Sequence, residues 1–221
     1  MLVKEEKILL MAKESQDTNS IILAIKQIVN NCIVDKIDIN KLAIFDLDYL
    51  YVKIRANSVD TKVMLSYVDE DDEPKQKGDK MELPTYNFSV DLNDVTVKFP
   101  DEKVDNVIKL GPDSGLKLKY PEVSVYDSPK LAKAQTAEAI VEEMIAGIFD
   151  SYFKGNKVYS FKDETRASID KFIDGLDLET YNKVVSYFNN LPKIYYEVKF
   201  TNSKGQERTN VLDKLTDFFT F

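Results

Sequence analysis

Apolar side chains recur at helical spacing through the first sixty residues. A short amphipathic segment covers residues 4–12, and cap-forming side chains at residues 17–19 precede a second helix. A third helix is predicted to begin near Asn40. The two longer helices carry apolar stripes at steps of three or four residues, formed by Ile21, Ile25, Ile28 and Cys32 and by Leu42, Phe45, Tyr49 and Val52. The pattern therefore predicts a helical N-terminal region over residues 1–59.

The middle third changes to the residue types and the alternation of β-strands. Residues 62–68 are rich in strand-forming side chains, and a charged loop is predicted over residues 69–80. Short alternating runs follow, at residues 88–92, 95–99, 107–110 and 116–120. Residues 111–115, between the last two runs, form a strong turn signal. We expect a small antiparallel sheet within residues 60–125.

Helical spacing returns after Pro129. Thr136, Asp163 and Asp177 are candidate N-caps of three further helices, and Gly175 is a candidate stop for the second of them. A hairpin is then predicted from residues 194–200 and 207–212, with its turn at residues 202–205, followed by a short apolar chain end. This helical region with its C-terminal hairpin covers residues 126–221.

The order of these elements predicts an α+β fold rather than alternating β–α units. It has a helical N-terminal part, a small central antiparallel sheet and a helical C-terminal part that ends in a β-hairpin and a short helix. The three regions, 1–59, 60–125 and 126–221, form one or two compact domains, and no flexible linker separates them.

Composition narrows the function classes. Hydrophobic residues make up 43% of the 221 residues and charged residues 31%, as in a folded globular protein. No apolar run approaches the roughly 20 residues of a membrane helix, and the N-terminus lacks the features of a signal peptide. The formal net charge of −8 opposes binding to a phosphate backbone. We therefore expect no membrane and no nucleic-acid partner, and a cytoplasmic location.

The chain has no histidine and one cysteine. The commonest general base and the commonest transition-metal ligand are thus missing. A single cysteine excludes an intramolecular disulfide and any metal site built from several cysteines. Cys32 lies on an apolar stripe, so we interpret it as a core residue rather than a reactive thiol. We predict no catalytic residue, no cofactor and no metal site.

One motif suggests an alternative from another function class, an Asp-dependent phosphatase or hydrolase that uses Asp46 and Asp48. Residues 43–48 resemble the nucleophile motif of haloacid-dehalogenase-like phosphatases, in which a strand delivers two aspartates. That motif continues with glycine and threonine or serine, whereas Tyr49 and Leu50 follow here. The spacing favours a helix with both aspartates on its solvent side.

Two other segments resemble ligand sites only partly. The acidic run at residues 69–73 suggests calcium, but it lacks the glycine and glutamate spacing of an EF-hand loop, which favours a solvated loop. Residues 111–115 lack the lysine and hydroxyl pair of a phosphate-binding loop and are interpreted as a hairpin turn.

The chain end carries four large apolar side chains, Leu215, Phe218, Phe219 and Phe221. Burying one phenylalanine contributes roughly 1.5–3 kcal/mol, so several left in water would be costly. They either fold back onto the core or dock into another protein. Both alternatives stay open from the sequence, and these four residues are the candidate partner-binding site.

Segments near both chain ends resemble the baseplate hub proteins of T-even-like contractile-tailed bacteriophages. The similar segments are residues 6–15, 25–32, 42–50, 55–59, 172–176, 188–192 and 215–219. The resemblance implies a late protein without catalytic residues, a hub subunit or hub assembly factor that binds other hub proteins as a homo- or hetero-oligomer. It implies the host bacterial cytoplasm during assembly and the tail baseplate of the virion afterwards. A transient assembly chaperone absent from the virion is the alternative.

Many relatives in that family carry a Cys-x-x-Cys knuckle in the last hairpin. Residues 201–205 of this chain occupy that place and contain no cysteine. The resemblance therefore implies no metal in this hairpin, and its glycine turn is expected to hold it alone.

Overall fold

The computed structural model describes residues 1–14, 18–77, 80–101, 104–134 and 136–219. The α-helices are α1 (Val3–Glu14), α2 (Thr18–Cys32), α3 (Ile44–Ser58), α4 (Ala137–Gly147), α5 (Arg166–Asp174), α6 (Leu178–Asn189) and α7 (Leu215–Phe218). The strands are β1 (Lys62–Val68), β2 (Lys75–Lys77), β3 (Lys80–Glu82), β4 (Thr85–Asp91), β5 (Thr96–Lys98), β6 (Val107–Gly111), β7 (Ser114–Leu118), β8 (Phe149–Lys154), β9 (Lys157–Ser160), β10 (Lys193–Thr201) and β11 (Glu207–Leu212). This mixture of helices and small antiparallel sheets confirms the predicted α+β class.

Helices α1, α2 and α3 confirm the helical N-terminal region, but α3 begins later than predicted. Residues Ile39–Lys41 form a separate 3-10 helix, and Ile44 opens α3. The backbone between them is extended because it bonds to another segment: the Ile44 amide donates to the Pro121 carbonyl at 3.1 Å, and the Leu42 carbonyl accepts from the Val123 amide at 2.8 Å. The cap proposed at residue 17 lies outside the described residues.

The described strands divide among four antiparallel sheets instead of forming one central sheet. Their orders are β1-β4, β2-β3, β11-β10-β5 and β6-β7-β8-β9. The predicted central sheet is wrong in this respect because its strands pair with later parts of the chain: β5 with β10, and β7 with β8. The charged loop expected over residues 69–80 is also shorter, since β2 and β3 form a small hairpin at its far end.

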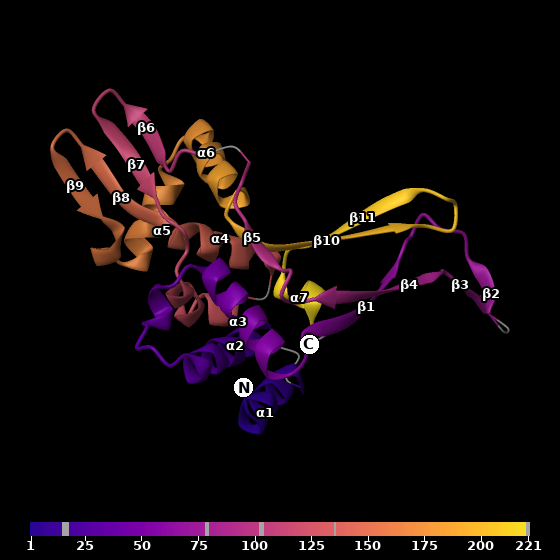
Figure 1. The fold of residues 1–221 in the computed structure, drawn as a ribbon. Coiled ribbons are helices and arrows are strands. Elements are labelled where there is room, and N and C mark those ends of the chain that lie inside the picture. The colour runs from indigo at the N-terminus through magenta and orange to yellow at the C-terminus, as the bar shows by residue number, and fades with distance from the viewer. Residues whose placement is uncertain (15–17, 78–79, 102–103, 135, 220–221) are drawn as a thin grey trace.

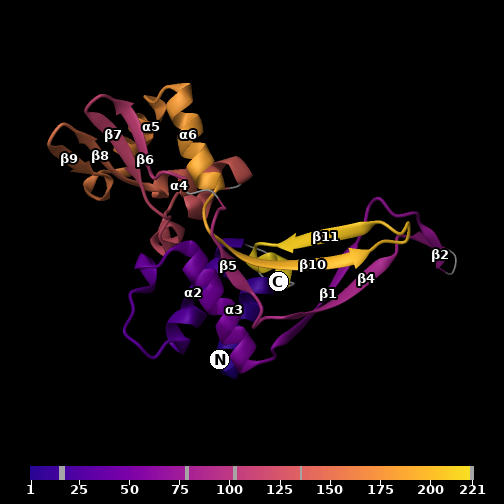
Figure 2. The same cartoon turned by 45° about the horizontal axis from the view of Figure 1, so that its top comes forward.

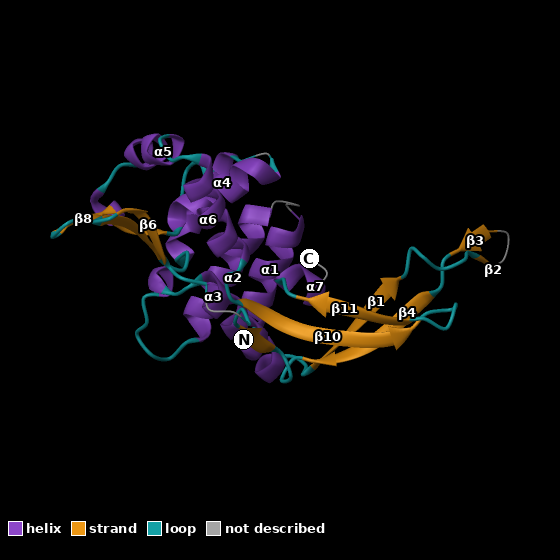
Figure 3. Ribbon diagram, turned by 90° about the horizontal axis from the view of Figure 1, so that it is seen from above, coloured by secondary structure: helices purple, strands orange, loops and turns teal. Residues whose placement is uncertain are grey.

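Two β-ribbons stack into an arm that extends away from the helices (Figures 1 and 3). One ribbon is β1-β4 and the other is β10-β11, and the β2-β3 hairpin continues from the far end. Side chains of alternate residues face inward, where the Phe200 ring lies 4.7 Å from that of Tyr86 and 5.4 Å from that of Phe88, centroid to centroid. Strands with period-two apolar residues thus form a thin two-layer sandwich.

The sheet β6-β7-β8-β9 packs with α4, α5 and α6 at the opposite end of the molecule (Figures 1 and 2). The predicted caps Thr136 and Asp177 are confirmed, because their side chains accept hydrogen bonds from the amides of Ala139 and Thr180. Helix α5 is capped by Thr165 rather than Asp163. Asp163 was a wrong choice because it ends a short 3-10 helix that Ser160 caps.

Three clusters of buried apolar residues hold the fold together. The first joins α3, the arm and α7; the second fills the sheet of four strands and its helices; the third joins α2, α3 and a 3-10 helix at Val123–Asp127. Tyr51, Leu47 and Ile28 in the third cluster are at most 1% exposed. Each cluster draws on distant parts of the chain, and the division at residues 59 and 125 stays a prediction.

Candidate partner-binding surfaces

Asp46 and Asp48 both lie on helix α3, with Asp46 in its first turn. The helix predicted here is confirmed, and the strand that would deliver a phosphatase nucleophile is not formed. The expected solvent-facing position is only partly confirmed, because Asp46 and Asp48 are both half-buried. Burial raises the pKa of the Asp48 carboxyl to about 7. Burial and the nearby Asp48 carboxylate also raise the pKa of Tyr126. Asp48 is thus a half-buried residue within a helix and does not stand at the end of a strand.

No set of three or more cysteine, aspartate or glutamate side chains is placed to bind a metal ion within the described residues. No helix in the described ranges has the length and apolar character needed to cross a bilayer.

The acidic run joins the two ribbons of the arm at its far end. The Asp69 side chain accepts from Arg208 Nε on β11 at 2.9 Å and from Asn202 Nδ2 at 3.1 Å. Arg208 Nη2 also reaches Asp71 at 2.7 Å. These contacts hold the pKa of the Asp69 carboxyl below its usual range, chiefly through the Arg208 hydrogen bond. We call this set of contacts the tip lock.

Asp72 forms the second half of the tip lock. Its carboxylate accepts from the Ser203 amide at 3.1 Å, the Ser203 hydroxyl at 2.7 Å and the Tyr86 hydroxyl at 2.7 Å. Asp69 and Asp72 are each 5% exposed, so the solvated loop expected here is wrong for these two residues. Their oxygens are occupied by donors of the chain itself.

The turn at the end of the last hairpin depends on more than its glycine. Asn202 Oδ1 accepts from the amides of Lys204 at 3.1 Å and Gln206 at 2.9 Å, while Gly205 adopts a φ of 76°. The expectation that the glycine holds this hairpin alone is therefore wrong. The sequence analysis did not identify Arg208. The one sequence feature that marks it is a positive charge at a position of β11 whose side chain faces inward.

The described part of the C-terminal segment packs against its own chain. Phe218 is 0% exposed in the first cluster, and Leu215 and Phe219 are half-buried against the first and third. The Phe219 ring meets Tyr51 edge-on at 5.4 Å. Phe221 lies outside the described residues. A partner-binding role for these four residues stays a prediction.

A hollow of about 390 Å³ adjoins the C-terminal segment. It is lined from α1, α3, β1 and α7 by residues that include Leu10, Met64 and Phe219. Leu10 is 57% exposed and Met64 69%, so exposed apolar side chains lie beside Phe219.

A separate aromatic patch lies where α3, β5 and the segment after β7 meet. The Phe45 ring packs edge-on against Phe99 at 6.0 Å and Tyr120 at 5.3 Å. Phe99 is 56% exposed and Tyr120 41%, so the patch faces solvent. Exposed aromatic clusters of this kind are enriched in protein interfaces.

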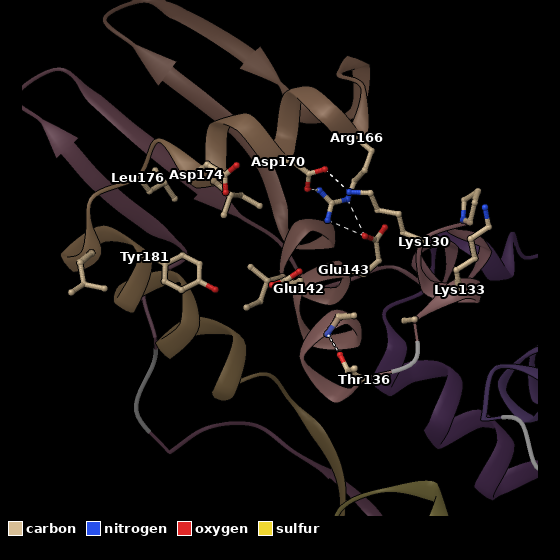
Figure 4. Close-up of a pocket in the computed structure, with 16 residues that line it drawn as sticks. Lys130, Lys133, Thr136, Glu142, Glu143, Arg166, Asp170, Asp174, Leu176 and Tyr181 are labelled. Carbon is tan, nitrogen blue, oxygen red and sulfur yellow. Dashed lines mark hydrogen bonds and ion pairs between the residues drawn. The ribbon is translucent and has the colours of Figure 1, made fainter.

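The third surface is a groove of about 750 Å³ among α4, α5 and α6 (Figure 4). Along one wall, Arg166 Nε lies 3.0 Å from the Glu143 carboxylate, and Arg166 and Lys130 both contact Asp170. Burial alone would raise the pKa of Glu143, but hydrogen bonds from Arg166 and Ser128 outweigh it and lower that pKa. These groups form an internally paired network that fixes α4 to α5.

Residues 1–220 match the model of a family described as T4 bacteriophage base plate protein. No curated protein and no solved structure matches the chain.

Proposed function

The chain belongs to the T4 bacteriophage base plate protein family, and from this premise we propose that it is a baseplate hub subunit or hub assembly factor that acts by binding other proteins. The observation that carries the proposal is the extent of the family match, which covers residues 1–220. Baseplate proteins of this structural family are generally not enzymes, and we assign the chain no catalytic role.

Exposed apolar side chains support a role in protein binding. Phe99 on the aromatic patch, Met64 beside the C-terminal segment and Leu178 beside the groove are 56%, 69% and 74% exposed. Large apolar side chains at a surface cost free energy in water that a partner surface recovers on binding. The three lie at well-separated places on the molecule, which suits a subunit that contacts several neighbours.

The arm also supports assembly through contact. Its two ribbons extend from the helical part of the molecule (Figure 3), and the tip lock fixes their far end. A rigid projection reaches a neighbour without the entropy cost of ordering a loop on binding.

Co-expression with the other baseplate proteins tests the proposal. We expect the chain to elute with hub proteins in size-exclusion chromatography and to leave wedge proteins unbound. A chain that stays monomeric with every hub protein, or that elutes with wedge proteins alone, would contradict it.

The proposal has two forms, a hub subunit and a transient assembly chaperone. Mass spectrometry of purified virions separates them. A hub subunit is recovered in the particle in a fixed ratio to other baseplate proteins, whereas a chaperone is found only in the host cytoplasm during assembly.

A further inference from the structure

We propose that the groove among α4, α5 and α6 binds an amphipathic helix of another protein, with lysines or arginines beside its apolar face. The inference rests on the proposed function only in that the chain works by binding proteins. It names a surface and the chemistry of the partner that fits it.

The floor of the groove is apolar. Ile145 of α4 and Ile173 of α5 line it together with Leu176 and Tyr181, and Leu178 stands 74% exposed at its rim. The groove runs between packed helices, and its volume of about 750 Å³ is in the range of sites that hold several side chains. An amphipathic helix that lays its apolar face into such a groove is a recurring mode of recognition.

The charges of the groove divide into a paired set and an unpaired set. Arg166 and Lys130 are engaged by Glu143 and Asp170. Glu142, Asp174 and Lys133 also line the groove, and the described residues form no hydrogen bond or ion pair with any of these three side chains. In Figure 4, Asp174 lies on the same side of the groove as Tyr181, opposite Lys130 and Lys133. The two unpaired carboxylates select a partner with positive charge beside its apolar face.

The surrounding chain strengthens this selection. The residues that line the groove lie between Pro129 and Tyr181, and this stretch contains ten acidic and seven basic side chains, a net charge of −3. A net negative charge around the groove attracts a positively charged partner and repels a second copy of this acidic chain. The occupant is therefore a basic segment of a different protein.

The test uses two synthetic helical peptides, one of leucine and lysine and one of leucine and glutamate, added to the full chain. Methyl NMR follows Ile145 and Ile173 in the groove. We expect the lysine peptide to shift both methyl signals and the glutamate peptide to shift neither. Glu142→Lys combined with Asp174→Lys should lower the affinity for the lysine peptide by about tenfold or more, because both attractive charges become repulsive.

A matched double variant separates the groove from the overall charge. Asp35→Lys with Glu207→Lys makes the same change in net charge at two exposed residues outside the groove. It should leave affinity within about threefold of the unmodified chain. Equal losses in both double variants, or methyl shifts in the arm instead of the groove, would overturn the proposal, as would self-association through the groove in sedimentation analysis.

The groove proposal and the proposed function can be refuted independently of each other. If the peptide binds independently of Glu142 and Asp174 while the chain still elutes with hub proteins, the groove inference is wrong and the function stands. If the chain elutes with no baseplate protein, the function is wrong, and the peptide titration still decides the groove.

Discussion

Arg208 on β11 donates a hydrogen bond to Asp69 at the end of β1, with Nε 2.9 Å from Oδ2 across 139 positions of sequence. This pair joins the two ribbons of the arm at the point farthest from the helices. Removing the guanidinium leaves the buried Asp69 carboxylate with weaker donors, which is costly for a buried charge. We predict that Arg208→Ala speeds amide hydrogen exchange of Asp71 and Ser203, while β10 near Ile194 keeps its protection.

Lys204→Ala is the matched control for this prediction. Lys204 lies in the same turn and is exposed, and only its backbone amide forms a hydrogen bond, which it donates to Asn202. Its removal should leave exchange at the tip unchanged. Exchange that increases equally in both variants would mean that the turn, and not the ion pair, holds the tip.

Acid should also open the tip lock. Hydrogen bonds from Arg208 hold the pKa of Asp69 below 3.8, and those from Ser203 and Tyr86 outweigh burial and do the same for Asp72. A group whose pKa is lowered in the folded state contributes stability above its ordinary pKa and loses it as pH falls through the lowered value. Exchange at the Ser203 amide, corrected for intrinsic pH dependence, should therefore rise only below about pH 4. A rise between pH 5 and 7 would contradict this.

Gly205 supports the same hairpin through its backbone. Its φ of 76° is strained for residues with a Cβ, although an added Cβ would meet no atom within 4 Å. Gly205→Ala should therefore lower the free energy of unfolding by about 1–2 kcal/mol, and Gly205→Asn by less, since asparagine tolerates this conformation. Urea denaturation followed by circular dichroism measures both. Equal losses would show that the left-handed backbone conformation does not limit this position.

Signals between neighbouring residues were readable from the sequence. Thr136 and Asp177 cap α4 and α6 as predicted because an N-cap depends on bonds to residues three positions away. The β10-β11 hairpin likewise follows from two alternating runs around a turn. These features are decided within a few residues and do not require the rest of the fold.

Contacts between distant residues were not readable. Phe149 fits the apolar stripe of the preceding helix, yet α4 ends at Gly147 and Phe149 opens β8, because β7 offers an open edge that pairs with it. The acidic run reads as a solvated loop because Arg208, which pairs with it, lies far along the chain. The groove was missed for the same reason: its walls come from three helices whose packing no local pattern specifies.

Replacing Phe218 tests whether the C-terminal segment belongs to the core or contacts a partner. It is 0% exposed in the first cluster, so Phe218→Ala should lower the free energy of unfolding by about 3–5 kcal/mol. Phe99→Ala, at a residue 56% exposed, should cost no more than about 1 kcal/mol. Chemical denaturation gives both values. A Phe218→Ala chain of unchanged stability that fails to elute with hub proteins would instead make Phe218 a partner contact.

Asp48 is predicted to make the protein less stable as pH rises toward neutrality. Burial raises its pKa from 3.8 to about 7, so the folded state holds a proton that the unfolded state releases between these values. The contribution of Asp48 to stability is therefore greatest below about pH 4, and it is lost as pH rises from there through about 7. Asp48→Asn removes this dependence and should stabilise the chain at pH 8 by about 1–3 kcal/mol, because the neutral amide has no charge whose hydration is lost on folding.

Asp46→Asn is the control on the same helix, and its expected effect on stability is the opposite, a loss. Asp46 lies in the first turn of α3, where the helix dipole favours a negative charge. Its replacement should lower stability at pH 8 by about 0.3–1 kcal/mol. Urea denaturation of both variants at pH 4.5 and pH 8 measures the contrast. If Asp48→Asn destabilised the chain at pH 8, the Asp48 carboxylate would have to be stabilised in its ionised form by the fold, and the hydrophobic surroundings inferred for it would be wrong.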